Sequence, residues 1–212
     1  MIDSGHLEEN HGQATRPDSP DPKHGAKEAH REEVRESDAP FEGSLALSAL
    51  KRSVGLGTHE QCVVGIDPGR SGGVAVIGME TGRAVAYRMP FTTRDTWELI
   101  DLVCGRNEFT VAYIEKVHAM PKQGVTSMFR FGRQLGNLEM ALIAADVRFI
   151  WVRPVDWQRS LGLIRKDKNE KSRDKKNRHK QLAQELFPNL KVIHAIADAL
   201  LIAEFARRST EP

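Results

Sequence analysis

The stretch that decides the fold is Cys62-Val-Val-Gly-Ile-Asp67-Pro-Gly-Arg-Ser-Gly-Gly-Val-Ala-Val-Ile77, in which two apolar runs flank a short polar turn. Such runs predict buried β-strands, and the Pro-Gly and Gly-Gly steps between them predict a tight reversal of the chain. The first run ends on a carboxylate, Asp67, which is rarely placed beside a hydrophobic core without a partner. Asp67 is therefore either a turn-forming residue or a functional group.

Outward from this stretch, hydrophobic patterning predicts a mixed α/β domain. We expect strands at 61–67, 73–79, 83–89, 109–115 and 147–152, and helices at about 94–105, 125–145, from Pro154, 176–187 and 194–208. The first of these helices is expected to turn Trp97 toward the core. A three-stranded meander followed by alternating helices and strands is the element order of the ribonuclease H-like fold, a five-stranded mixed sheet flanked by helices. Periodicity alone does not separate this fold from other α/β layouts.

Composition divides the chain of 212 residues into an acidic tail and a basic domain. Residues 1–60 carry 7 Lys/Arg and 12 Asp/Glu, whereas residues 61–212 carry 24 and 17. We expect residues 1–58 to be a disordered tail, with a short helix as an option near its end, and residues 59–212 to form the folded domain. A basic domain suits a polyanionic partner, although an ordinary solvated surface has the same balance.

Two cysteines without paired spacing argue against a disulfide framework or a zinc site and favour a reducing compartment. No apolar run approaches the roughly 18 residues that span a bilayer, so no membrane association is expected. The expected location is cytoplasmic or nucleoid-associated, and import into an organelle stays open.

Carboxylates recur where predicted elements end. The strand VAYIE ends on Glu115, as VVGID ends on Asp67, and if the two strands are neighbours their acids lie side by side at one sheet edge. Their mutual repulsion would raise one pKa unless a cation neutralises them, and Mg²⁺ prefers such oxygen ligands. In the last predicted helix, His194 and Asp198 are four residues apart and share one face, so they could join the same site.

Five segments in order carry a family resemblance: VVGIDPGRSGGVAVI, VAYIEKVHAMPKQGVTSMFRFGRQLG, VRPVDWQRSLGL, QLAQELFP and HAIADALLIAEFA. Over residues 61–208 the chain resembles the RuvC-like Holliday junction resolvases, in particular the branch of plant chloroplast and phage-encoded resolvases. The resemblance implies catalytic metal ligands at Asp67, Glu115, His194 and Asp198. The chain departs from the family at Ala195 and Ile193, where relatives often carry Asp. His194 is therefore expected to take the fourth ligand position of the metal site.

The resemblance also implies an activity: cleavage of four-way DNA junctions by two-metal-ion hydrolysis in recombination, repair or phage DNA processing. Two Mg²⁺ ions per site are expected, with Mn²⁺ able to substitute, and His194 either ligates metal or orients the water. The expected partners are branched DNA and a second copy of the chain. The helix at 125–145 has apolar residues on more than one face, which suits a dimer contact as well as a core position.

Basic residues near these segments are expected to contact DNA. The run at 165–180 has nine Lys/Arg against three acids, although such a run is often only a solvated linker. The predicted DNA contacts are Arg70, Ser71, Lys116, Lys122, Gln123, Arg130, Arg133, Lys175, Lys176 and Arg178.

Plainer explanations stand beside each functional one. Glu115 could have no role beyond an ion pair with Lys116 or Arg130. His194 could likewise lie beside the start of a helix without binding a metal. Among functions, the alternatives are another ribonuclease H-like nuclease acting on flaps, branched DNA or RNA–DNA hybrids, an actin-like ATPase, or an inactive junction binder. The ATPase fold needs a second domain that about 150 residues do not supply, and retention of three acids disfavours an inactive binder.

Overall fold

The computed structural model describes residues 61–104, 110–118, 124–164 and 170–210. The expected tail at 1–58 lies outside the described residues, as do the predicted DNA contacts Lys122 and Gln123.

The described strands form one five-stranded sheet in the order β3-β2-β1-β4-β5. The strands are β1 (Cys62–Asp67), β2 (Gly73–Gly78), β3 (Ala84–Arg88), β4 (Val111–Glu115) and β5 (Arg148–Val152). The meander β1-β2-β3 is antiparallel, whereas β4 and β5 run parallel to β1. This order and these directions are those of the ribonuclease H-like fold, so the predicted fold class is confirmed.

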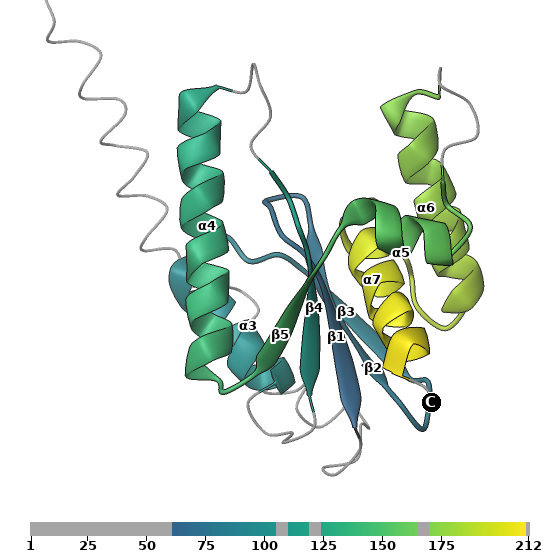
Figure 1. Cartoon of the computed structure of the whole chain (residues 1–212), viewed down its shortest axis with the longest axis horizontal. Coiled ribbons are helices and arrows are strands. Elements are labelled where there is room, and N and C mark those ends of the chain that lie inside the picture. Colours follow the sequence, from purple (N-terminus) through teal and green to yellow (C-terminus); the bar gives the residue numbers. More distant parts are fainter. Residues whose placement is uncertain (1–60, 105–109, 119–123, 165–169, 211–212) are drawn as a thin grey trace, which may run out of the picture. The chain divides into compact units, whose positions relative to one another are not determined.

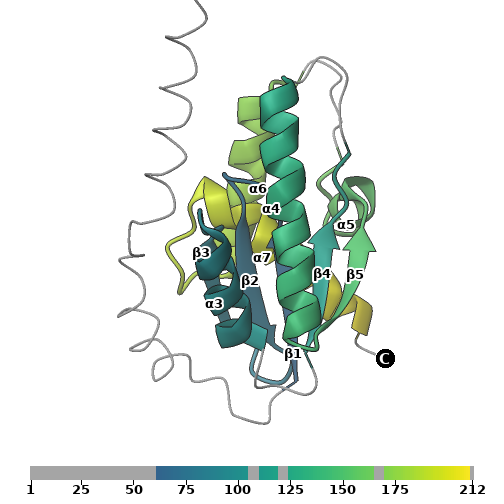
Figure 2. The ribbon, with the colours of Figure 1, turned by 90° about the vertical axis from the view of Figure 1, so that its left-hand side faces the viewer.

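Helices cover both faces of the sheet (Figure 1). Helices α3 (Thr93–Cys104) and α4 (Val125–Ala144) lie on one face, and α5 (Pro154–Ser160), α6 (Ser172–Leu186) and α7 (His194–Thr210) lie on the other. Figure 2 shows α3 and α4 in front of the sheet. The bounds agree with the predicted elements to within two residues, except that α6 begins at Ser172 rather than at 176.

Strand alternation divides the core into two clusters. Cys62, Val64 and Ile66 of β1 pack with α3 and α4, whereas Val63 faces the cluster of α5, α6 and α7. Because the side-chain period of a strand is two, Asp67 belongs to the α7 side of the sheet. The same alternation in β4 places Glu115 on that side, since Ala112 and Ile114 pack with α3 and α4.

Helix α7 lies directly on the sheet because glycines leave room for its backbone. A Cβ at Gly65 would collide with the backbone of Ala199 and Ala203, so only glycine allows this contact between β1 and α7. Burial of Ala199, Leu200 and Ile202 on the same helix completes the packing. The close approach fixes the height of α7, and therefore of Asp198, above the strand that carries Asp67.

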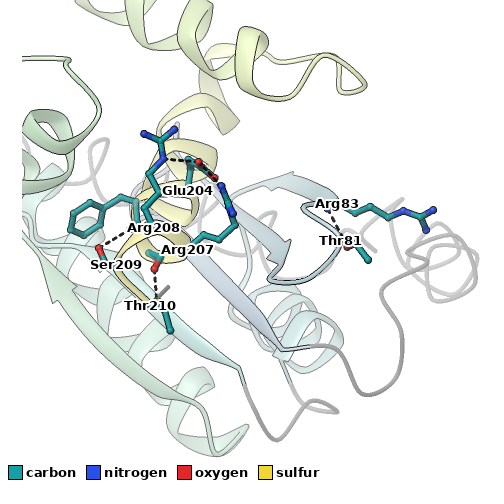
Figure 3. Close-up of polar contacts among 9 residues, drawn as sticks. Thr81, Arg83, Glu204, Arg207, Arg208, Ser209 and Thr210 are labelled. Carbon is teal, nitrogen blue, oxygen red and sulfur yellow. Dashed lines mark hydrogen bonds and ion pairs between the residues drawn. The ribbon is translucent and has the colours of Figure 1, made fainter. Parts of the chain in front are cut away.

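The C-terminal end of α7 is held by a buried carboxylate (Figure 3). Glu204 accepts hydrogen bonds from Arg207 Nε at 2.9 Å and from Arg208 Nε at 2.8 Å. Burial alone would raise the pKa of Glu204, but the two guanidinium groups outweigh burial and lower it. This end of α7 is occupied with structural ion pairs, in contrast to the end that carries Asp198.

Two details differ from the sequence prediction or bear on it. Trp97 is 39% exposed on α3, so its predicted core position is wrong; Leu99 and Ile100 are among the buried residues of that helix. Among the described helices, none is long and apolar enough to cross a bilayer.

Candidate active site

Two strand ends bring the first pair of acids together. Ile66 of β1 pairs with Ile114 of β4 in parallel register, so Asp67 and Glu115 occupy the next position along adjacent strands. Both residues are on the side of the sheet that faces α7. The strand register therefore places the two carboxylates side by side at the end of the sheet, as predicted.

The turn after Asp67 closes tightly against that residue. A Cβ at Gly72 would collide with the Asp67 carbonyl oxygen and would lie 3.0 Å from Asp67 Cγ. Gly72 also closes the turn by donating its N–H to the Gly69 carbonyl at 3.0 Å. The Gly-Gly step therefore serves the carboxylate directly, because any larger residue would push the Asp67 side chain out of place.

The electrostatics of the two acids bring a third one, Asp198 of α7, into the same site. Burial, then the charges of Glu115 and Asp198, raise the pKa of Asp67 well above its usual range, against a lowering effect of Lys176. Burial likewise raises the pKa of Glu115; Asp198 adds to the increase, while Trp157, Lys175 and His179 oppose it. The three carboxylates, from β1, β4 and α7, therefore interact electrostatically at one end of the sheet.

Two of these acids are each held by a ring nitrogen. Trp157 Nε1 of α5 donates a hydrogen bond to Glu115 Oε1 at 3.0 Å. His179 Nδ1 of α6 lies 2.8 Å from Asp198 Oδ1. Both rings are fully buried, with Trp157 at 0% and His179 at 1% exposure. Glu115 is therefore oriented by Trp157, rather than by the Lys116 or Arg130 considered from the sequence.

His179 was missed by the sequence reading, which treated it as part of a charged run. A signal was present: His179, Leu182, Ala183 and Leu186 follow helical spacing and form the inward side of α6. A histidine on an apolar stripe is most often a core residue, and only the fold shows that its ring reaches Asp198.

His194, the predicted fourth ligand, is the first residue of α7 and is exposed. It lies one helical turn before Asp198, as expected from their spacing. Its role at the metal stays a prediction.

The predicted DNA contacts on α6 divide into two kinds. The positive charges of Lys175 and Lys176 act on Glu115 and Asp67 respectively and lower the pKa of each acid, so both lysines lie within electrostatic range of the site. Arg178 instead binds Glu170 through two nitrogens, at 3.1 and 2.9 Å, and donates to the Leu163 carbonyl at 2.8 Å. Arg178 thereby joins α6 to the segments that precede it.

The other described DNA candidates are exposed: Arg70 and Ser71 in the β1–β2 turn, Lys116 after β4, and Arg130 and Arg133 on α4. The Arg70 guanidinium lies 5.2 Å from the ring centroid of Phe91, which is itself exposed.

Asp67, Glu115 and Asp198 are candidate metal ligands. Within the described ranges, no group of three His, Cys, Asp or Glu side chains is arranged so that it could hold an ion. The donor chemistry nevertheless fits a hard divalent cation, because Glu115 and Asp198 both raise the pKa of Asp67 and a bound positive charge would offset that repulsion.

Comparison with known proteins finds similarity in fold. No protein-family model and no curated protein matches the chain. Among solved structures, T. thermophilus RuvC in complex with a Holliday junction substrate is 19% identical, with a TM-score of 0.48, covering 71% of this chain and 97% of that chain. A second Thermus thermophilus RuvC structure is 19% identical, with a TM-score of 0.47 and coverage of 70% and 96%. The yeast mitochondrial Holliday junction resolvase is 14% identical, with a TM-score of 0.42 and coverage of 76% and 83%.

Proposed function

We propose that the chain is a structure-selective DNA endonuclease that hydrolyses phosphodiesters at four-way junctions. The observation that carries this proposal is the convergence of Asp67, Glu115 and Asp198 from three elements, with Lys175 and Lys176 within electrostatic range of them. Such a site has carboxylates that can bind metal ions and lysines that can bind phosphates. Metal-dependent phosphodiester hydrolysis uses both kinds of group. The order of the sequence motifs supports a junction as the substrate.

The residues that would hold metal are Asp67, Glu115, Asp198 and His194. Two Mg²⁺ ions bound there, with Mn²⁺ able to substitute, would activate a water and stabilise the leaving 3′-oxygen. The charges of both Glu115 and Asp198 act on Asp67, which supports a role for Asp67 as a ligand shared by the two ions. His194 would either ligate the second ion or orient the attacking water through a hydrogen bond.

The chain's basic residues would bind the junction arms. Lys175 and Lys176 would contact phosphates next to the acids, and the exposed Arg70, Arg130 and Arg133 would extend the contact along α4 and the β1–β2 turn. Lys116, Ser71, Lys122 and Gln123 complete the proposed DNA surface, whereas the interactions of Arg178 favour a structural role.

A homodimer is proposed because a junction has two strands to cut symmetrically, which needs two sites related by a two-fold axis. Helix α4 carries an apolar stripe on the side opposite its buried residues Leu138, Ala141 and Leu142. The members of this α4 stripe are Val125, Phe129, Gly132, Gly136, Met140 and Ile143. Its four large residues are 59–86% exposed, and a Cβ at either glycine would meet nothing within 4 Å.

A cleavage panel tests the substrate class. Labelled four-way junction, flap, duplex and RNA–DNA hybrid substrates would be incubated with the full chain and Mg²⁺. We expect symmetric nicks near the junction centre and little cleavage of the other substrates. Preferred cleavage of the hybrid or the flap would assign the site to a different nuclease of the same fold.

A further inference from the structure

The residues that orient Glu115 and Asp198 touch each other. Trp157 and His179 come from different helices, α5 and α6, and their rings meet edge to face, with centroids 5.3 Å apart and planes at 72°. Each ring binds one carboxylate, so the chain Glu115, Trp157, His179, Asp198 is continuous. The acid at the end of β4 is thereby connected to the acid on α7 through a buried ring pair.

Each hydrogen bond uses one oxygen of its carboxylate. Trp157 occupies Oε1 of Glu115, and His179 occupies Oδ1 of Asp198. In the described part of the chain, the other oxygens, Oε2 and Oδ2, have no such partner and remain free to bind a cation. Outer-shell donors of this kind set the direction in which a ligand's second oxygen points.

The second nitrogen of His179 supports a fixed ring orientation. His179 Nε2 is buried and has no hydrogen-bond partner among the described residues. A donor without an acceptor is more costly to bury than an acceptor without a donor, so the proton belongs on Nδ1, where it points at Asp198. Among the described residues the ring has one polar contact, with Asp198, and its packing against Trp157 restricts its rotation.

We propose that Trp157 and His179 form one positioning unit that aligns Glu115 and Asp198 for a shared divalent cation. This inference rests on the proposed metal site and adds to it the residues that shape it. Because the rings contact each other, disturbing either ring is expected to loosen both carboxylates. Neither ring contacts the substrate in this account.

The test compares four single variants and one double variant of the full chain. Trp157→Phe keeps a ring but removes the Nε1–H, His179→Leu removes the donor but fills the space, and His179→Asn retains a donor near the Nδ1 position. Trp151→Phe is the matched control, because Trp151 contacts Phe149 on the other face of the sheet. Thermal denaturation of each variant establishes that it folds. If His179→Leu does not fold, the two single variants Trp157→Phe and His179→Asn are compared with the wild type instead.

The first readout is Mn²⁺ affinity, measured by electron paramagnetic resonance without DNA. Loss of an outer-shell partner should weaken binding about ten-fold or more in Trp157→Phe and in His179→Leu. His179→Asn should recover most of the loss, and Trp151→Phe should match the wild type. The double variant Trp157→Phe/His179→Leu should lose less than the two single losses combined, because the rings act as a unit.

The second readout is the indole N–H resonance of Trp157 in ¹H–¹⁵N spectra, assigned by its absence from Trp157→Phe. We expect this resonance to shift and to exchange faster with water in His179→Leu. Unchanged Mn²⁺ affinity in folded variants, an unchanged resonance, additive losses, or a wild type that binds no Mn²⁺ would each overturn the proposal. If the affinities and the resonance change as expected but no junction is cut, the positioning unit stands and the proposed function fails.

Discussion

At the residue scale, the central feature is a carboxylate placed where burial and like charges disfavour it. The pKa of Asp67 is raised by burial and by Glu115 and Asp198, so the ionised side chain lowers the stability of the fold at neutral pH. Functional sites often keep such groups at the expense of folding free energy. A cation bound by these carboxylates, as proposed, would remove the penalty.

Asp67→Asn should therefore stabilise the protein when metal is removed with a chelator. We expect the melting temperature at neutral pH to rise by about 2–4 °C, which corresponds to roughly 1 kcal/mol for a domain of this size. Because the folded-state pKa is raised, the wild type gains a proton, and with it stability, as pH falls from that pKa toward the ordinary value of 3.8. The advantage of the variant should shrink over that window.

The control for this prediction is Asp146→Asn, since Asp146 is exposed and Asn tolerates its positive φ of 54°. The control should leave the melting temperature unchanged. A lower melting temperature for Asp67→Asn in the chelated protein would contradict the electrostatic account of the site.

The acids were predictable from the sequence and the rings were not, for a physical reason. Asp67 and Glu115 each end an apolar run, so strand pairing alone brings them together. The contact of His179 with Asp198 depends on how α6 packs against α7, which no local pattern encodes. Trp97 was misplaced because the apolar stripe of α3 is completed by Leu99 and Ile100, which leaves the indole at its exposed border.

At the element scale, α6 carries structural contacts and proposed DNA contacts within two turns. The helix begins at Ser172 without a side-chain cap, so its start gave no sequence signal and its bound was predicted too late. Arg178 fixes the helix to Glu170 and Leu163, His179 faces Asp198, and Lys175 and Lys176 lie near the acids. The described part of the charged run, from Ser172 onward, is therefore the start of a packed helix.

Replacing Lys175 and Lys176 together by Ala should weaken junction binding and flatten its salt dependence. Each lost phosphate contact should reduce the slope of log affinity against log salt by about 1. The measurement is a fluorescence anisotropy titration at several salt concentrations, with Lys191→Ala, an exposed lysine outside α6, as the control. An unchanged slope in the double variant would reject α6 as a DNA contact.

Arg178→Ala is expected to act on folding instead. Removing the guanidinium leaves Glu170 and the Leu163 carbonyl without these hydrogen bonds, at a cost of about 1–2 kcal/mol for a partly exposed group. Urea denaturation measures this loss. A normal unfolding midpoint combined with a reduced salt slope would instead assign Arg178 to DNA, as the sequence suggested.

At the scale of the whole molecule, the proposed symmetric cleavage of a four-way junction needs two copies of the chain. Phe129→Glu combined with Met140→Glu places two charges on the exposed α4 stripe and should convert a dimer into a monomer. Light scattering coupled to size-exclusion chromatography measures the mass, and Ser127→Glu, an exposed position off the stripe, should leave it unchanged. A wild-type chain that is monomeric at micromolar concentration would contradict the dimer.

The most direct test of the central claim is cleavage of a labelled synthetic four-way junction, followed on a gel with and without Mg²⁺. The wild type should cut the junction only when Mg²⁺ is present, and Asp67→Asn should bind the junction but leave it intact, since the variant lacks the proposed bridging carboxylate. Cleavage of the junction by Asp67→Asn at the wild-type rate, or by the wild type in the presence of a chelator, would contradict the account.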